Sequence, residues 1–190
     1  MNLVELWWTG VTHPRRAFDE LGSRPAPQWG FRVVLIFNLA IAVFTLLPLY
    51  LRGSEPLMSS ALTFLPTEQY LLAEIFFLPP LRIVVWILGA AVTHLALRLV
   101  GQPGGFDQLL NIGGLEYLVV MPFILVTDWL LIIVDRYDIA MVTHSLVLPW
   151  TMILTVIGLR QLLDVKRATA WGLILLSTVT TLPFLALLAR

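Results

Sequence analysis

Residues 31–50 read FRVVLIFNLAIAVFTLLPLY, and this stretch decides the fold class of the chain. It is apolar almost throughout, and its one charged residue is Arg32, near its start. A helix needs about 20 mainly apolar residues to cross a bilayer. A segment in lipid must also pair its own backbone polar groups, which a helix does without a neighbour. We therefore predict a transmembrane helix over residues 31–50.

Four further apolar stretches of similar length follow this one. Polar breakers separate them, among them the glycine-rich Gly101–Gly105 and the charged Asp135–Asp138. The stretches cover residues 75–100, 109–134, 139–163 and 168–189. The sequence thus predicts an all-α fold: an integral membrane helical bundle with five transmembrane helices, occupying residues 31–190.

Composition supports this class and excludes several others. Of the 190 residues, 58% are hydrophobic and 13% are charged, and charged residues make up roughly 25% of an ordinary soluble domain. Mean hydropathy is +0.87. Twelve basic residues balance twelve acidic ones, so there is no basic excess and we expect no nucleic-acid partner. The chain has no cysteine, which excludes disulfides and thiolate metal sites.

Residues 1–30 form a separate, cytoplasmic N-terminal segment. It carries aromatic residues at Trp7, Trp8 and Phe18, and His13-Pro14 resembles a helix start, since proline favours the first helical position. We predict an amphipathic interfacial helix that lies on the cytoplasmic leaflet. The alternative is that this segment packs as a plug under the bundle.

Basic residues near span ends predict the topology, because cytoplasmic loops carry the excess of Lys and Arg. If the N-terminus is cytoplasmic, eight basic residues lie on that side: Arg15, Arg16, Arg24, Arg32, Arg98, Arg160, Lys166 and Arg167. Four lie on the other: Arg52, Arg82, Arg136 and Arg190. We predict a cytoplasmic N-terminus and an outside C-terminus, most simply in a bacterial inner (plasma) membrane.

Ionisable residues inside the predicted spans occur at matching depths. Arg82 and Asp128 lie the same number of residues before and after Gly105, in the turn between the second and third spans. His144 reaches the depth of Asp128 from the fourth span. Charges in a membrane are costly and normally pair with each other or face water. We predict a buried polar cluster of Arg82, Asp128 and His144, which either fastens three helices together or forms a substrate, lipid-headgroup or proton site.

His94 and Glu116 also lie at matching depth about Gly105 and form a secondary predicted pair. The three histidines lie on different segments, so we expect no metal site. Nucleophile and phosphate-binding motifs are absent from the sequence. We expect no cofactor and no enzymatic activity.

The order of short motifs resembles the Yip family, the five-span membrane proteins known as Rab-GTPase-interacting factors, and especially its prokaryotic branch. The motifs are Pro14-Arg15-Arg16-Ala17-Phe18, Gly101–Gly105 before Phe106 and Leu109-Leu110, Gly114-Leu115-Glu116-Tyr117 before Pro122, and Trp150–Leu162 before Arg167-Ala168. The resemblance implies five spans with a cytoplasmic N-terminus and, in eukaryotes, vesicle traffic and binding of prenylated Rab proteins. It implies no catalytic residue. Arg24–Gln28 stands where the family has an acidic Asp-Leu-Tyr-Gly-Pro stretch.

Two functional interpretations follow. The first is a non-enzymatic membrane-organising or partner-binding protein that acts through its bundle and its cytoplasmic N-terminal face. The second is a small transporter, channel or lipid-handling protein that uses the Arg82–Asp128–His144 cluster. The expected partners are membrane lipids, a protein at the N-terminal face, and a second copy of the chain packed through small residues such as Gly89 and Gly113.

Overall fold

The computed structural model describes residues 2–23, 28–55, 66–102 and 104–186. Within these ranges the chain is helical, and no strand occurs. The elements in chain order are α1 (Leu3–Thr12), α2 (Pro14–Gly22), α3 (Trp29–Ile41), the π-helical turn η1 (Ala42–Leu46), α4 (Leu47–Leu51), α5 (Thr67–Leu99), α6 (Phe106–Ile133), the 3₁₀ turn η2 (Tyr137–Ile139), α7 (Ala140–Leu163) and α8 (Arg167–Ala186).

Four helical segments of the described chain are long and apolar enough to cross a membrane. They are Trp29–Leu51, Gln69–Leu99, Phe106–Ile133 and Tyr137–Leu163. Large apolar side chains on their outer faces are exposed, including Phe76 and Leu146, as a bilayer solvent requires. The second span was predicted to begin at residue 75, but its helix begins at Thr67, because the helix extends beyond the apolar stretch. Pro79 and Pro80 lie inside this helix and do not end it. The stretch predicted as the fifth span coincides with α8, which is not one of these four segments, and residues 187–189 of that prediction lie outside the described residues.

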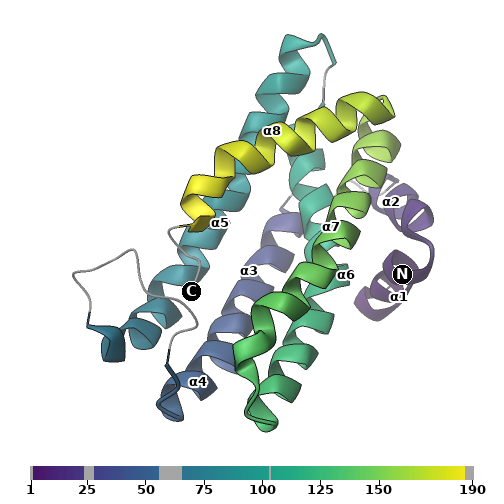
Figure 1. The fold of residues 1–190 in the computed structure, drawn as a ribbon. Coiled ribbons are helices and arrows are strands. Elements are labelled where there is room, and N and C mark those ends of the chain that lie inside the picture. Colours follow the sequence, from purple (N-terminus) through teal and green to yellow (C-terminus); the bar gives the residue numbers. More distant parts are fainter. Residues whose placement is uncertain (1, 24–27, 56–65, 103, 187–190) are drawn as a thin grey trace.

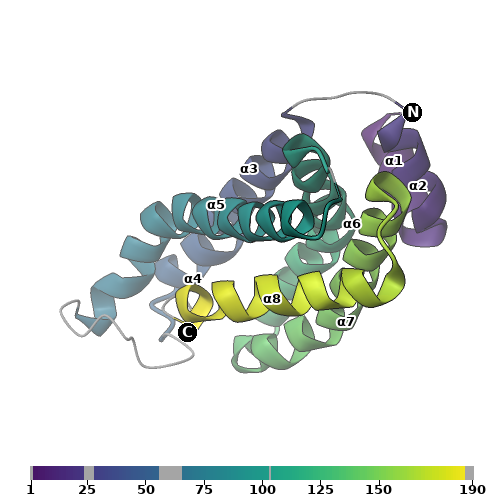
Figure 2. The same cartoon turned by 90° about the horizontal axis from the view of Figure 1, so that it is seen from above.

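Helix α6 is the centre of the bundle. It packs against α3, α5 and α7, while α8 packs along α5 and against α7 (Figure 1). Seen from above, α5 and α8 run side by side, and α7 lies beyond them next to α6 (Figure 2). The main hydrophobic core lies where α2, α6, α7 and the N-terminal half of α3 meet. This arrangement leaves the space between α5 and α7 bounded by α6 on one side and α8 on another.

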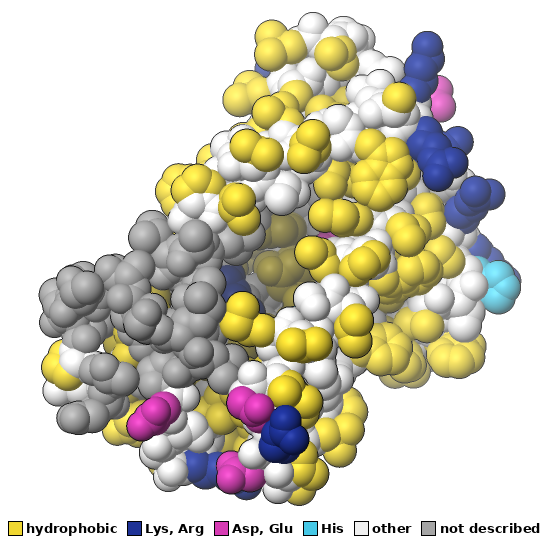
Figure 3. All heavy atoms as spheres, viewed as in Figure 1, with side chains coloured by type: hydrophobic (Ala, Val, Ile, Leu, Met, Phe, Trp, Pro, Cys, Tyr) yellow, Lys and Arg dark blue, Asp and Glu magenta, His cyan; other side chains and the backbone are white. Residues whose placement is uncertain are grey.

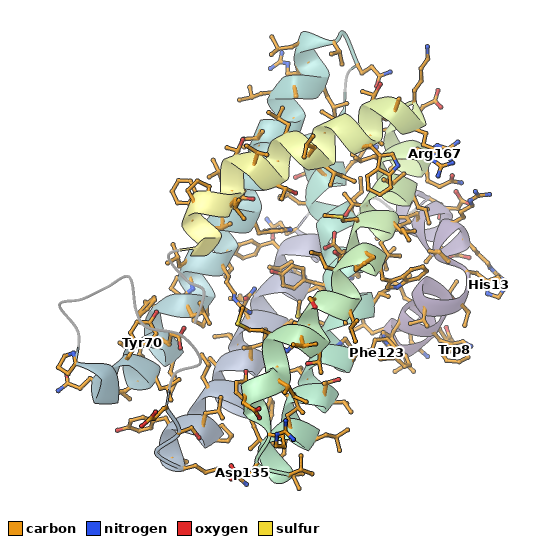
Figure 4. All side chains as sticks on the ribbon, viewed as in Figure 1. Trp8, His13, Tyr70, Phe123, Asp135 and Arg167 are labelled. Carbon is orange, nitrogen blue, oxygen red and sulfur yellow. The ribbon has the colours of Figure 1, made fainter. Side chains whose placement is uncertain are left out.

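The N-terminal helices α1 and α2 pack on the side of α6 and α7. Phe18 of α2 is fully buried and lies so close to Gly158 of α7 that a Cβ there would be 2.8 Å from its ring. Trp7 of α1 contacts Phe123 of α6, with ring centroids 5.9 Å apart. Trp8 points away from the bundle (Figure 4). The N-terminal segment predicted to be interfacial therefore consists of two helices, and both pack on the bundle.

Helices α3 and α6 approach each other closely at two glycines. Gly114 faces the backbone of Gly30, and a Cβ at position 114 would lie 3.2 Å from the Gly30 carbonyl carbon and oxygen. The Gly30 backbone N–H donates to Asn111 Oδ1 at 3.0 Å. Small residues permit such contacts between membrane helices. This close approach brings the far half of the first span within hydrogen-bonding reach of α6.

Candidate functional site

A cavity of about 620 Å³ lies inside the bundle between α5, α6, α7 and α8. Its volume falls within the roughly 300–1,000 Å³ of small-molecule sites. The space exists because α5 and α7 each pack on α6 and α8. The molecule is visibly hollowed on this face below α8, with hydrophobic side chains around the hollow (Figure 3).

The cavity wall combines apolar side chains with a set of ionisable ones. Leu78, Met121 and Leu148 are examples of the apolar part. The ionisable wall residues within the helical bundle are Glu74, Arg82, Glu116, Asp128 and His144, together with the tyrosines Tyr117 and Tyr137. A wall of this kind suits a molecule with a polar end and an apolar body, because each end would meet matching chemistry.

Asp128 is the most firmly held of these groups. It is 1% exposed, and each of its oxygens has a partner from a different helix. Asp128 Oδ1 lies 2.7 Å from His144 Nε2 on α7, and Asp128 Oδ2 accepts a hydrogen bond from Thr45 Oγ1 at 3.0 Å. The structure therefore joins two of the three residues in the predicted cluster, and it adds a threonine from the first span.

The π-helical turn η1 positions Thr45. Pro48 has no backbone N–H, so the carbonyl of Phe44 cannot receive its usual helical hydrogen bond. The chain widens there, and the Leu47 N–H donates to the Ala42 carbonyl five residues earlier. Such turns are frequent at functional sites. Sequence reasoning missed Thr45, and Pro48 was the one local signal that could have pointed to it.

Arg82 lies on the same cavity wall but is not paired with Asp128. Within the part of the chain that the structure describes, no hydrogen bond or salt bridge to Arg82 is formed. Contacts between α5 and α6 set the level of Arg82: Trp86 lies against Gly113 and Leu78 packs with Met121, so Arg82 lies level with Tyr117 and not with Asp128. The predicted depth match of Arg82 and Asp128 is corrected accordingly, although both residues line the same cavity. A charged donor thus faces the cavity.

The predicted pair of His94 and Glu116 is not formed among the described residues, which corrects that expectation. The His94 ring lies edge-on to Phe106 at 5.8 Å between centroids, and its Nδ1 is buried without a hydrogen-bond partner. Glu116 instead accepts a hydrogen bond from Thr155 Oγ1 on α7 at 2.7 Å. The two side chains do not share a depth: His94 lies level with Phe106, ten residues before Glu116 on α6, and Glu116 lines the cavity whereas His94 does not.

The end of the bundle near η2 carries charges of both signs. Arg136 forms an exposed ion pair with Asp138, with Nε and Oδ1 3.0 Å apart, and this hydrogen bonding raises the pKa of the Arg136 guanidinium above its usual value. Arg52 donates to the backbone carbonyl of Ile132 at the same end. Asp135 and Arg167 lie at opposite ends of the molecule (Figure 4). In the described residues, no group of three His, Asp or Glu side chains is arranged to hold a metal ion.

Comparison with known proteins gives one match. A family model described as Yip1 domain matches residues 8–189, a range that contains every residue of the cavity wall named above. No curated protein and no solved structure matches the chain.

Proposed function

The chain belongs to the Yip1 domain family of membrane proteins, and from this premise we propose that it is a non-enzymatic, five-span membrane protein that holds a lipid in its bundle cavity. The observation that carries this proposal is the cavity itself. It presents a charged donor, Arg82, beside apolar walls. Ionisable residues at membrane depth usually mark functional sites.

The proposed lipid places its headgroup against the ionisable wall and its acyl chains against the apolar one. A volume of about 620 Å³ accommodates a headgroup and the first part of the chains. The mouth of the cavity lies on a face rich in exposed apolar side chains (Figure 3). A lipid would therefore enter sideways from the bilayer, without its chains crossing water.

Helix α8 is the fifth span of this proposal. It has 20 residues, which at 1.5 Å per residue span about 30 Å, the thickness of the hydrocarbon core. Lys and Arg side chains gather at its starting end, and the opposite end of the molecule carries fewer of them, beside Asp and Glu (Figure 3). With the positive-inside rule, this excess of basic residues at one end supports a cytoplasmic N-terminus, an outside C-terminus and a plasma-membrane location of bacterial inner-membrane type.

A second candidate function is membrane organisation through a partner at the N-terminal face. The observation that favours it is helix α1, which is docked on α6 yet leaves Leu3, Val4 and Trp8 more than half exposed. Exposed apolar side chains on a docked helix fit a partner or the lipid interface. The partner would be another protein or a second copy of the chain.

A cavity-filling substitution tests the lipid-binding proposal. Thr178 of α8 lines the cavity, whereas the neighbouring Val179 is exposed on the outer face. We propose Thr178→Phe as the filling variant and Val179→Phe as its matched control. Both variants are reconstituted in vesicles that contain a phospholipid with a photoactivatable acyl chain, and crosslinked peptides are identified by mass spectrometry.

The proposal predicts crosslinks on wall residues of α5, α6 and α7 in the original chain and in Val179→Phe. Thr178→Phe should lose most of them while it keeps crosslinks on the outer faces. Equal crosslinking of the wall in both variants would mean that no lipid occupies the cavity. If Thr178→Phe keeps its wall crosslinks and a separate experiment captures a protein at α1, the second candidate is favoured.

A further inference from the structure

Resting on the proposed lipid-binding role, we infer that the cavity selects a phospholipid whose headgroup carries both a phosphate and a primary ammonium group. Three features of the wall lead to this chemistry: an arginine that faces the cavity, an excess of carboxylates around it, and a carboxylate oxygen that is open to a new donor.

Arg82 supplies the site for the phosphate. It lies on the cavity wall, and no side chain or carbonyl of the described residues accepts a hydrogen bond from it. A guanidinium presents a planar fork of donors that matches two phosphate oxygens. A cation at membrane depth is costly unless an anion accompanies it. A phosphate from the bilayer would provide that anion.

The carboxylates argue against a ligand that is only an anion. Glu55, Glu74, Glu116 and Asp128 line the same cavity, where Arg82 is the one guanidinium, so carboxyl groups are in excess on its wall. A purely anionic headgroup would gain from Arg82 but would be opposed by these groups. A purely cationic headgroup would be opposed by Arg82. A zwitterionic headgroup meets both kinds of wall charge and brings no net charge into the bundle.

Glu116 supplies the site for the ammonium group. Among the described residues its hydrogen-bond partner is Thr155, which donates to Oε2, and the side chain faces the cavity. By contrast, Asp128 already accepts a bond on each oxygen. Glu116 on α6 and Arg82 on α5 line the same cavity, and Arg82 lies level with Tyr117, the residue after Glu116. A primary ammonium has three N–H donors for such an oxygen, whereas a quaternary ammonium has none.

Lipid competition on the full chain tests this inference. The purified protein in detergent micelles is exchanged with equal amounts of phosphatidylethanolamine, phosphatidylcholine and phosphatidylglycerol that share the same acyl chains. The lipid retained is counted by native mass spectrometry. A separate sample receives soluble phosphoethanolamine, which distinguishes a free phosphate ester from a lipid headgroup.

The variants are Arg82→Gln, Arg82→Lys and Glu116→Gln, with Arg160→Gln as a matched control. Arg160 is exposed at the far end of α7 and outside the cavity. Circular dichroism melting of each variant establishes that it is folded. Arg82→Lys keeps the charge, so it remains informative if Arg82→Gln does not fold.

We expect the original chain and Arg160→Gln to retain phosphatidylethanolamine at least about tenfold over the other two lipids, as charged hydrogen bonds of this kind provide. Arg82→Gln should lose retention of phosphatidylethanolamine about tenfold, and Arg82→Lys less. Glu116→Gln should shift the preference toward phosphatidylglycerol, since removing a carboxylate lowers the repulsion of an anion.

Two results would overturn the inference, and they differ in what they mean for the lipid-binding role. If the three lipids are retained equally and Thr178→Phe displaces them all, the cavity binds lipid without the proposed selectivity. If no lipid is retained by any variant, the lipid-binding role fails as well. Retention of soluble phosphoethanolamine in place of lipid would show that the site takes a free phosphate ester.

Discussion

The substitution Gly114→Ala tests whether the close approach of α3 and α6 holds the bundle together. A Cβ at position 114 would overlap the Cα of Gly30 and lie 3.2 Å from its carbonyl carbon and oxygen. Carbon atoms in contact normally lie about 3.5–4.0 Å apart. The obstacle is backbone, so no side-chain rotation can relieve it. The two helices must separate.

The expected destabilisation can be worked from the contacts that separation affects. Overpacking costs about 1–3 kcal/mol. Moving Gly30 away also breaks its hydrogen bond to Asn111, 3.0 Å long, and an unpaired buried amide costs about 1–3 kcal/mol. Alanine regains up to about 1 kcal/mol as a better helix former than glycine. We expect the free energy of unfolding to fall by about 3 kcal/mol.

The matched control is Gly172→Ala on α8, where nothing lies within 4 Å of an added Cβ. That variant gains helix propensity without a clash, so its stability should stay within about 1 kcal/mol of the original, toward higher stability. Unfolding by SDS titration in mixed micelles, followed by circular dichroism, measures both. The reasoning is refuted if Gly114→Ala unfolds at the same SDS fraction as Gly172→Ala.

Three more predictions follow from single contacts. Phe18→Ala empties a fully buried position and should weaken the docking of α2 by about 3 kcal/mol, seen as faster amide exchange in α1 and α2 while α6 keeps its protection. Asp128→Ala and His144→Ala remove the two ends of one contact of 2.7 Å, so their effects on stability should be non-additive by about 0.5–3 kcal/mol, and additive effects would contradict the contact. Because the chain has no cysteine, the variants Ser23→Cys and Ser54→Cys each carry a single thiol. An impermeant maleimide added to sealed right-side-out vesicles should label Ser54→Cys and not Ser23→Cys. Equal labelling of the two variants would contradict the proposed topology.

Several features of the fold could be predicted from the sequence because they depend on local composition. The apolar runs predict membrane helices, since lipid offers no hydrogen bonds to backbone groups. The structure has four helical segments of the required length and apolarity, and each overlaps one predicted span. The family resemblance was predicted from short motifs and is confirmed over residues 8–189.

The site was predicted only in part, because counting outward from a turn assumes which residue of the turn lies midway between the two helices. Each residue rises 1.5 Å, so an error in that midpoint shifts every predicted pair along the helix. The count brought Asp128 to the level of His144, and these two do meet at 2.7 Å. The same count paired His94 with Glu116, whereas His94 lies level with Phe106, ten residues away.

The sequence alone thus determined that this protein is a membrane protein and where its four long apolar helices lie, because both follow from the apolarity of consecutive residues. Tertiary structure alone decided which polar groups share the cavity. Thr45 reaches Asp128 only because a π-helical turn rotates it and two glycines let α3 approach α6. Arg82 does not meet Asp128 because the packing of α5 on α6 sets it level with Tyr117, eleven residues before Asp128. Such outcomes depend on helix rotation and spacing, which residues distant in the chain set together.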